Sequence, residues 1–390
     1  MLAPLTNAPR DYAWGSTTLI ADLQGRAPGG GPEAEVWFGD HPGSPAIVGD
    51  GSGRTLDAVL AGGADRLPYL LKILAAASPL SIQVHPSKAQ AEAGHAREDL
   101  AGVPADAAER NYRDDNHKPE VIVALGERFE ALAGLRDLAA TRRVLDALGA
   151  GGGELAGRLF GTAATDPAGA LRATIARLLS GEAQAVVDDV IHAIRTAPDD
   201  ALEAEPTADL AALRRIADAY PGDPGVVVAL LMNHVALRAG EAVFVPAGVL
   251  HAYISGLGVE IMAASDNVLR GGLTPKHIDV PELLSILDTT PGDPPRLAPV
   301  PSGDGVSVFA PGIPDFALAR VALVDGAVRR IALHGPAIAL ATAGDVRARV
   351  ASGGELAMPV GTAVFASADE GVLELTGTGE VYVAQPGPAS

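Results

Sequence analysis

Apolar and polar positions divide the chain into distinct stretches. Over residues 1–130, short apolar runs are broken by Gly and Pro, a pattern that predicts strands of an antiparallel sheet or barrel. Over 131–221, apolar residues recur every three or four positions, which predicts amphipathic helices. Strand-like runs return at 226–256, a short helix is expected at 281–287, and short alternating strands with Gly turns occupy 303–390. The pattern therefore predicts a mainly β protein that carries a helical insert.

The length and charge of the chain limit the classes of function it can have. Its 390 residues exceed what one hydrophobic core usually spans, so two or three domains are expected. The formal net charge of −19 argues against nucleic acid or an anionic membrane as a partner, because both need a positive protein surface. A small anionic substrate stays compatible, since a local group of Arg and Lys can bind it.

Features missing from the sequence exclude several kinds of site and segment. The chain has no Cys, which rules out disulfides and thiolate metal sites. Residues 1–16 contain no basic segment followed by an apolar one, so no secretory signal is expected. No run approaches 18 uninterrupted apolar residues, so no membrane span is expected. We therefore expect a cytoplasmic protein, and we expect it to be a monomer.

Lysine is rare, and its positions are informative. The lysines are Lys72, Lys88, Lys118 and Lys276, whereas Arg is abundant. A Lys that stands among so many Arg is a candidate for a role that needs a compact charge with an adjustable pKa. Lys118 and Lys276 fall inside the motifs described next, and we expect Lys88 to lie on the surface.

A bend motif runs from Gly240 to His251. Gly240 permits a turn into a strand, Pro246 and Gly248 shape a tight bend, and the next strand begins at His251. A Gly, five residues, P-x-G, two residues and a His is the order of the second cupin signature. The Asn that usually follows in that signature is replaced here by Ser255. We expect His251 to point into the mouth of a barrel.

The segment 80–86 places polar side chains on one face of a strand. Its strict alternation puts Ser81, Gln83 and His85 on the same side. Because buried polar groups need partners, such a face must either line a site or meet solvent.

The segment 117–123 supplies a carboxylate. Lys118 and Glu120 share one face if this run is extended, and Pro119 favours an extended backbone at the residue before it. The three segments together offer two imidazoles, one carboxylate and one amide oxygen, a set that suits Zn²⁺ with an open position for water. The amide oxygen leaves Mn²⁺, Fe²⁺ and Co²⁺ open as alternatives. The candidate metal ligands are Gln83, His85, Glu120 and His251.

Longer blocks around these residues resemble a known family. They are PLSIQVHP at 79–86, DDNHKPEVIVAL at 114–125 and PAGVLHAYISGLGVEIMAASDNVLRGGLTPK at 246–276. The N-terminal blocks AEVWFGDHPGSPA and DYAWGS look similar too. In order and separation the blocks resemble those of type I mannose-6-phosphate isomerases. The resemblance covers residues 1–290, and the last hundred residues are similar in general texture.

The resemblance implies a mainly β fold of two cupin (jelly-roll) barrels with an inserted α-helical domain. It implies a catalytic cupin domain formed by 1–130 and 222–290, a helical insert at 131–221, and a C-terminal cupin-like β domain at 291–390. It implies one Zn²⁺ per chain and a small sugar phosphate as substrate, interconverted between mannose 6-phosphate and fructose 6-phosphate. The zinc ligands that it implies are Gln83, His85, Glu120 and His251.

Aldose–ketose interconversion moves a proton between C2 and C1 through an enediolate, so it needs a base and a stabilising cation. Glu260 and Asp266 lie in the family's VE-x-M-x-x-SDN block and are alternative bases between which the sequence does not choose. Arg270, followed by two Gly, is assigned to enediolate or phosphate stabilisation. Lys118, beside a predicted ligand, is assigned to shuttling a proton or polarising an oxygen. The candidate substrate and phosphate contacts are Ser81, Lys72 and Lys276.

Two other functions compete with the isomerase. A cupin oxygenase would use Fe²⁺ with two His and a carboxylate, but it usually leaves more positions open than a site with Gln83 would. A sugar-binding bicupin without catalysis would leave Lys118, Glu260 and Arg270 without a role.

Overall fold

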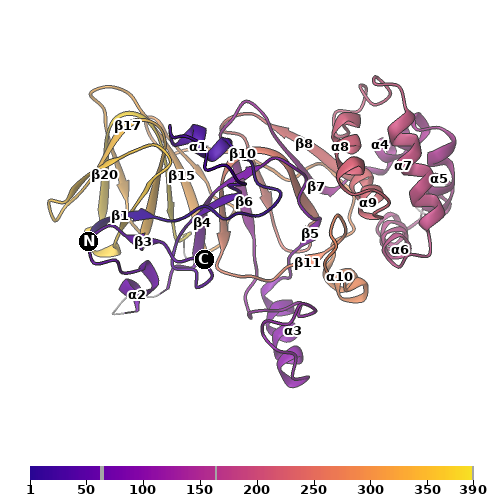
Figure 1. The fold of residues 1–390 in the computed structure, drawn as a ribbon, viewed down its shortest axis with the longest axis horizontal. Coiled ribbons are helices and arrows are strands. Elements are labelled where there is room, and N and C mark those ends of the chain that lie inside the picture. Colours follow the sequence, from indigo (N-terminus) through magenta and orange to yellow (C-terminus); the bar gives the residue numbers. More distant parts are fainter. Residues whose placement is uncertain (62–65, 163–164, 389–390) are drawn as a thin grey trace.

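The computed structural model describes residues 1–61, 66–162 and 165–388. Two antiparallel sheets and a group of helices are arranged in a row (Figure 1). The middle sheet lies between the other two parts; the second sheet, which contains the C-terminal residues, lies at one end, and the helices between residues 138 and 231 lie at the other end. The expected mainly β fold with a helical insert is confirmed.

The middle sheet is organised around one long strand. β10 pairs with β4 and β6 along its second half and with β5 and β7 near its start. The strands of this sheet are β2 (Glu35–Phe38), β4 (Tyr69–Ala76), β5 (Gln83–Val84), β6 (Glu120–Ala124), β7 (Phe129–Leu135), β8 (Met232–Leu237), β9 (Ala242–Val245), β10 (His251–Ala263), β11 (Leu269–Arg270) and β12 (Arg296–Leu297).

The second sheet contains residues from both ends of the chain, because β1 pairs antiparallel with β19 and with β3. Apolar side chains of the two sheets share one core, in which Val259 of the middle sheet lies with Phe309 and Leu340 of the second. The strands of the second sheet are β1 (Leu2–Thr6), β3 (Ile47–Val48), β13 (Val300–Pro301), β14 (Val306–Phe309), β15 (Ala317–Leu323), β16 (Val328–Ala332), β17 (Ala337–Val350), β18 (Glu355–Met358), β19 (Ala363–Ala366) and β20 (Val372–Gln385).

The helical insert follows its apolar spacing. In α8, for example, Leu213 and Ile216 face the core, and the Asp209 side chain caps the first turn by accepting from the Ala212 N–H. At the junction with the sheet, the buried Arg136 donates to three backbone carbonyls. The helices of the insert are α4 (Leu138–Ala147), α5 (Ala150–Thr162), α6 (Pro167–Leu179), α7 (Gln184–Thr196), α8 (Leu210–Ala219) and α9 (Gly225–Leu231).

Two helices differ from the strand-like patterns read from the sequence. α3 (Lys88–Leu100) is held by a capping box, in which Ser87 accepts from the Gln90 N–H and the Gln90 side chain accepts from the Ser87 N–H. α9 (Gly225–Leu231) is a helix although its run of Val favours strands, because complete burial overrides a weak local preference.

The remaining short helices are α1 (Leu19–Leu23), α2 (Leu56–Leu60), the predicted α10 (Val280–Ile286), and a 3₁₀ turn at Ala368–Glu370. Within the described ranges, no helix is both long and apolar enough to cross a bilayer.

Candidate metal centre and substrate site

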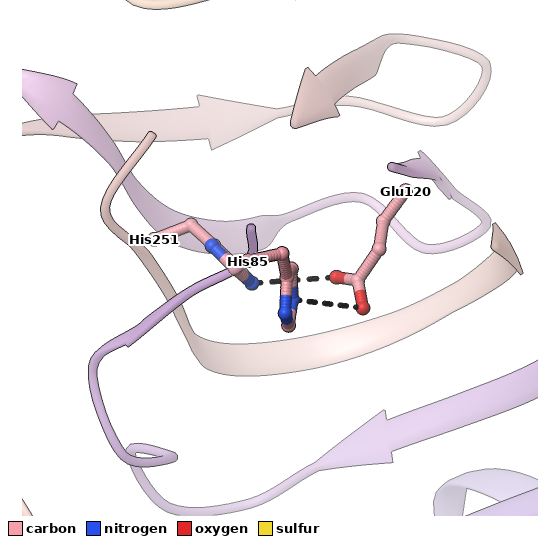
Figure 2. Close-up of side chains that lie close together, drawn as sticks. All are labelled: His85, Glu120 and His251. Carbon is pink, nitrogen blue, oxygen red and sulfur yellow. Dashed lines mark ion pairs between the residues drawn. The ribbon is translucent and has the colours of Figure 1, made fainter. Parts of the chain in front are cut away.

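Three buried side chains from separate segments of the middle sheet lie close together (Figure 2). His85 follows β5, Glu120 begins β6 and His251 begins β10, directly across from Gln83 in the β5–β10 register. The Nε2 atoms of His85 and His251 each lie 3.3 Å from an oxygen of the Glu120 carboxylate. The polar strand face read from the sequence therefore points into a protein interior and not into solvent.

Backbone carbonyls fix the proton position on both rings. His85 Nδ1 lies 2.7 Å from the Asn267 carbonyl oxygen, and His251 Nδ1 lies 3.2 Å from the Val249 carbonyl oxygen. A carbonyl can only accept, so Nδ1 carries the proton in each ring and Nε2 turns a lone pair toward Glu120. The same arrangement orients histidine ligands in known metal sites.

The resulting cluster is chemically incomplete without a cation. The buried His85 Nε2 makes no hydrogen bond, although it faces a carboxylate oxygen. Burial lowers the pKa of His85 to about 4 despite the attraction of Glu120, so the ring is neutral at pH 7. A neutral imidazole lone pair beside a carboxylate is unfavourable unless a cation lies between them.

The spacing of the donors fits zinc. Two donors that are each about 2.05 Å from a tetrahedral ion lie about 3.3 Å from one another, and both His–Glu120 distances are 3.3 Å. The donor set of His85, Glu120 and His251 is also one of the two groups of His, Cys, Asp or Glu within the described residues that are close enough to share a metal.

Gln83, the fourth predicted ligand, lies beside this cluster. It is opposite His251 on β10 and Arg270 on β11, and its amide nitrogen lies 3.3 Å from Ser81 Oγ. A cavity next to the cluster is lined by Gln83, Glu120 and His251 together with other predicted site residues. Those further residues are Ser81, Lys72, Lys118 and Glu260.

Two buried lysines carry positive charge into this cavity. Lys118 Nζ lies 2.9 Å from a Glu120 oxygen. Lys72, opposite Glu260 in the β4–β10 register, lies 3.1 Å from the Glu260 carboxylate and 3.8 Å from that of Glu35. Burial lowers the pKa of Lys72, but the two carboxylates outweigh burial and hold it above its ordinary value. Lys72 thus points inward as a cation.

The two carboxylates proposed as alternative bases have different surroundings. Glu260 is buried, and burial raises its pKa although Lys72 opposes this effect. Asp266 follows β10, and its side chain is 48% exposed. Burial raises the pKa of Asp266 less than the His41 ring, Lys118 and Lys72 lower it, so this carboxyl stays below its ordinary value. Asp266 lines a neighbouring cavity and not the one that contains Glu260.

A group of unpaired cations lies beside the predicted ligands. Arg270 on β11 is half-buried, and both burial and the charge of Arg113 lower its pKa. Burial, Arg270 and Arg113 likewise lower the pKa of Lys276. Among the residues described by the structure, no acidic side chain forms an ion pair with any of these three cations. Arg113 was missed in the sequence, where it stands directly before the block at 114–125 with no spacing signal of its own.

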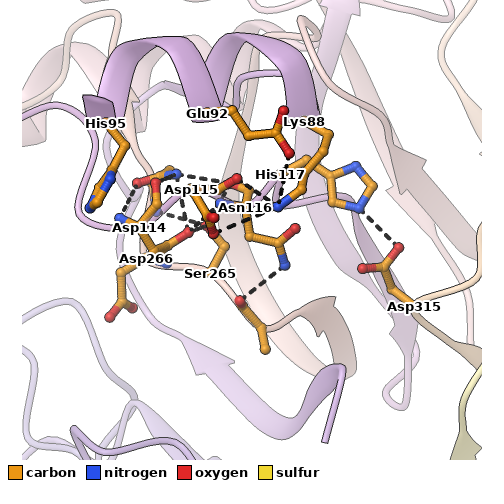
Figure 3. Close-up of polar contacts among 12 residues, drawn as sticks. Lys88, Glu92, His95, Asp114, Asp115, Asn116, His117, Ser265, Asp266 and Asp315 are labelled. Atoms are coloured by element: carbon orange, nitrogen blue, oxygen red, sulfur yellow. Dashed lines mark hydrogen bonds and ion pairs between the residues drawn. The ribbon is translucent and has the colours of Figure 1, made fainter. Parts of the chain in front are cut away.

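The loop after β10 is tied to the segment before β6 (Figure 3). Ser265 Oγ donates to Asp114, and the Asn267 side chain donates to the backbone oxygens of Asp114 and Asn116. These contacts hold the Asn267 carbonyl that orients His85. From the connection between β14 and β15, Asp315 lies 2.9 Å from the His117 ring.

The second possible metal group, Glu130 with Asp209 and His234, already has its own donors. The buried Glu130 carboxylate accepts from Arg128, Arg215, His234 and Ser255. These four donors leave no need for a cation, so we interpret the group as a link between α8 and the middle sheet.

Replacing Glu130 by Gln is expected to lower the free energy of unfolding at pH 7 by about 2 kcal/mol, because several charge-assisted hydrogen bonds weaken. These donors hold the pKa of Glu130 below its ordinary value. Its stabilising effect is therefore complete above the unfolded pKa of about 4.3 and is lost as pH falls through the lower folded value. Denaturant unfolding at pH 7, 5 and 4 should show the difference from the unaltered protein narrowing toward pH 4, while exposed Glu127→Gln stays near the unaltered protein. An equal difference at all three pH values would contradict this role.

A mainly β chain with a buried two-histidine, one-carboxylate centre and a rim of unpaired cations has the make-up of a metal-dependent enzyme. Residues 2–138 match the family model of the phosphomannose isomerase type I catalytic domain. The chain is 37% identical to mannose-6-phosphate isomerase of Salmonella typhimurium over 97% of both chains. It belongs to the type I mannose-6-phosphate isomerase family.

More distant relatives and solved structures agree with this assignment. The human mannose-6-phosphate isomerase is 32% identical, over 96% of this chain and 95% of that protein. A crystal structure of a zinc-bound mannose 6-phosphate isomerase superimposes with a TM-score of 0.86 at 34% identity, covering 99% of this chain and all of that one.

Proposed function

We propose that this protein interconverts mannose 6-phosphate and fructose 6-phosphate. The observation that carries the proposal is the His85–Glu120–His251 cluster, whose lone pairs converge beside a group of unpaired cations. The names of its relatives supply the substrate. In this proposal a small sugar phosphate is the partner, and one chain is enough to complete the site.

We propose that one Zn²⁺ is held by the two imidazoles and the carboxylate, with the Gln83 side chain as a fourth ligand. When bound, the ion supplies a Lewis acid that orients and polarises substrate oxygens. The Lys118 ammonium, 2.9 Å from Glu120, fixes that carboxylate and can donate a hydrogen bond to a substrate oxygen in the cavity.

We assign the phosphate to the cations beside β11. Arg270 and Arg113 offer planar guanidinium groups that can bind phosphate oxygens in a bidentate manner. Lys276 adds a third positive charge, and Ser81 adds a hydroxyl just before β5, the strand that pairs with β11. Burial and the charge of neighbouring Arg side chains lower the pKa of Arg270 and Lys276, and a dianionic phosphate would relieve this repulsion.

We propose Asp266 as the base that takes the proton from C2 and returns it to C1. Its carboxyl is half-exposed and ionised, whereas Glu260 is buried and engaged by Lys72. Glu260 then has the task of keeping the Lys72 ammonium charged beside the reacting oxygens. The enediolate that forms between the two proton transfers carries negative charge, which Lys72 and Arg270 stabilise.

At the level of architecture, we propose that the two sheets are two cupin barrels. The domain boundaries are 1–130 with 222–290, 131–221, and 291–390, with the N-terminal β1 and β3 completing the last of these. The catalytic site then lies inside the first barrel, where the side chains of His85 after β5, Glu120 of β6 and His251 of β10 lie close together.

The reaction can be tested by following mannose 6-phosphate in D₂O by NMR. We expect fructose 6-phosphate to form with deuterium at C1, and mannose 6-phosphate formed by the reverse reaction to carry it at C2, because a carboxylic acid formed on the base exchanges with solvent. Product formation without any deuterium would contradict proton transfer through the half-exposed Asp266. A product that forms in the presence of O₂ and is absent without it would favour an oxygenase, and binding without turnover would favour a sugar-binding protein.

A further inference from the structure

His41 makes a directed contact with Asp266. Its Nε2 atom lies 3.2 Å from both oxygens of the Asp266 carboxylate. The Gly43 backbone N–H donates to His41 Nδ1 at 3.0 Å, so Nδ1 carries no proton in the neutral ring. The proton is therefore on Nε2, and it points at the carboxylate.

The ring of His41 is held in place by its other neighbours. Trp37 packs against it edge to face, with ring centroids 4.9 Å apart. The Trp37 indole N–H in turn donates to Glu35 at 2.7 Å, and Lys72 lies 5.1 Å above the Trp37 ring. The His41 side chain is 12% exposed, whereas the carboxylate it contacts is 48% exposed. A more buried donor thus meets a more exposed acceptor.

Asp266 needs such a partner because it lies in a loop. Its backbone N–H is fixed by Asp114, but that bond leaves the side-chain torsions free (Figure 3). His41 and Asp266 line the same cavity, and Arg113 also lines it. A base must meet its substrate carbon within a few tenths of an ångström, and a misplacement of about 1 Å can cost about 100-fold in rate.

We propose that His41 is a positioning residue that aims the Asp266 carboxylate at the substrate through its Nε2–H. The inference rests on the proposed isomerase function and on Asp266 as its base. In this inference His41 is not a metal ligand, because both nitrogens of its ring already contact other groups, Nδ1 the Gly43 N–H and Nε2 the Asp266 carboxylate.

The competing explanation is that His41 only stabilises the turn at Gly43. The two explanations differ in how His41 depends on Asp266. A positioning residue loses its effect on turnover once the carboxylate is gone, whereas a turn-stabilising residue weakens every variant equally.

The test is a double-mutant cycle in the zinc-loaded, full-length protein, using His41→Ala, Asp266→Asn and the double variant. His41→Ala is expected to lower kcat about 10- to 100-fold with KM and zinc content nearly unchanged. In the Asp266→Asn background it should lower kcat less than about twofold. His41→Gln, which keeps a donor near the Nε2 position, should recover most of the activity.

A matched control is offered by His95, an imidazole that also lies near a carboxylate, 3.4 Å from that of Asp99, on α3. His95→Ala should leave kcat unchanged. Equal losses from His41→Ala in both backgrounds, or no recovery in His41→Gln, would overturn the inference. If the unaltered protein shows no isomerase activity, the proposed function fails. If Asp266→Asn turns over normally, Asp266 is not the base and the inference fails with it.

Discussion

Replacing Glu120 by Gln is expected to remove bound zinc and turnover together. Glu120 is the one anionic member of the cluster, and both imidazoles face it at 3.3 Å. Loss of a residue that merely supports a metal ligand usually costs about 10- to 100-fold in affinity or activity. Loss of the anionic ligand itself should therefore lower both zinc affinity and kcat by more than about 100-fold. Zinc per chain and kcat, measured on the same preparation, check this.

Glu260→Gln is the matched control for the zinc measurement, since it neutralises a second buried carboxylate in the same cavity. It should keep about one zinc per chain. A Glu120→Gln protein that retains full zinc and near-normal turnover would remove Glu120 from the metal site.

The second large effect is expected at Arg270. Arg270→Ala should lower kcat/KM by about 100- to 1,000-fold, the range found when a charge-stabilising group is removed from an active site. Stability should change little or increase slightly, because the half-buried guanidinium is repelled by Arg113 and forms no ion pair with a described residue. Steady-state kinetics measures the change in kcat/KM, and thermal unfolding of the same sample measures the change in stability.

Arg270→Lys restores the charge without the planar group, so partial recovery would identify a bidentate contact. Arg347→Ala, at an exposed ion pair of the second sheet, should behave like the unaltered protein. Near-normal kcat/KM in Arg270→Ala would take this residue out of the mechanism.

Much of the fold could be predicted because its signals are local. The spacing of apolar residues identified the helices of the insert, and short apolar runs bounded by Gly and Pro identified strands such as β4 and β6. α3 was missed because its Ala-rich sequence has little apolar contrast, although its Ser87–Gln90 capping box was a readable signal. α9 was misread because its Val residues are buried on every side, a property of the tertiary structure.

In the candidate site, too, local features could be predicted from the sequence and tertiary contacts could not. The strand faces of His85 and Glu120 and the bend before His251 are local features, so the candidate ligands could be named from the sequence. Arg113 and His41 could not, because each acquires its neighbours when distant segments close around the same cavity. The choice between carboxylates likewise depended on burial, which alternation alone does not report.

Removal and return of the metal test the central claim most directly. The protein is treated with a chelator until no metal is detectable, and conversion of mannose 6-phosphate is followed in a coupled assay. The account predicts that turnover disappears, that one equivalent of Zn²⁺ per chain restores it, and that Glu120→Gln is not restored. Full turnover in the metal-free protein would contradict the account.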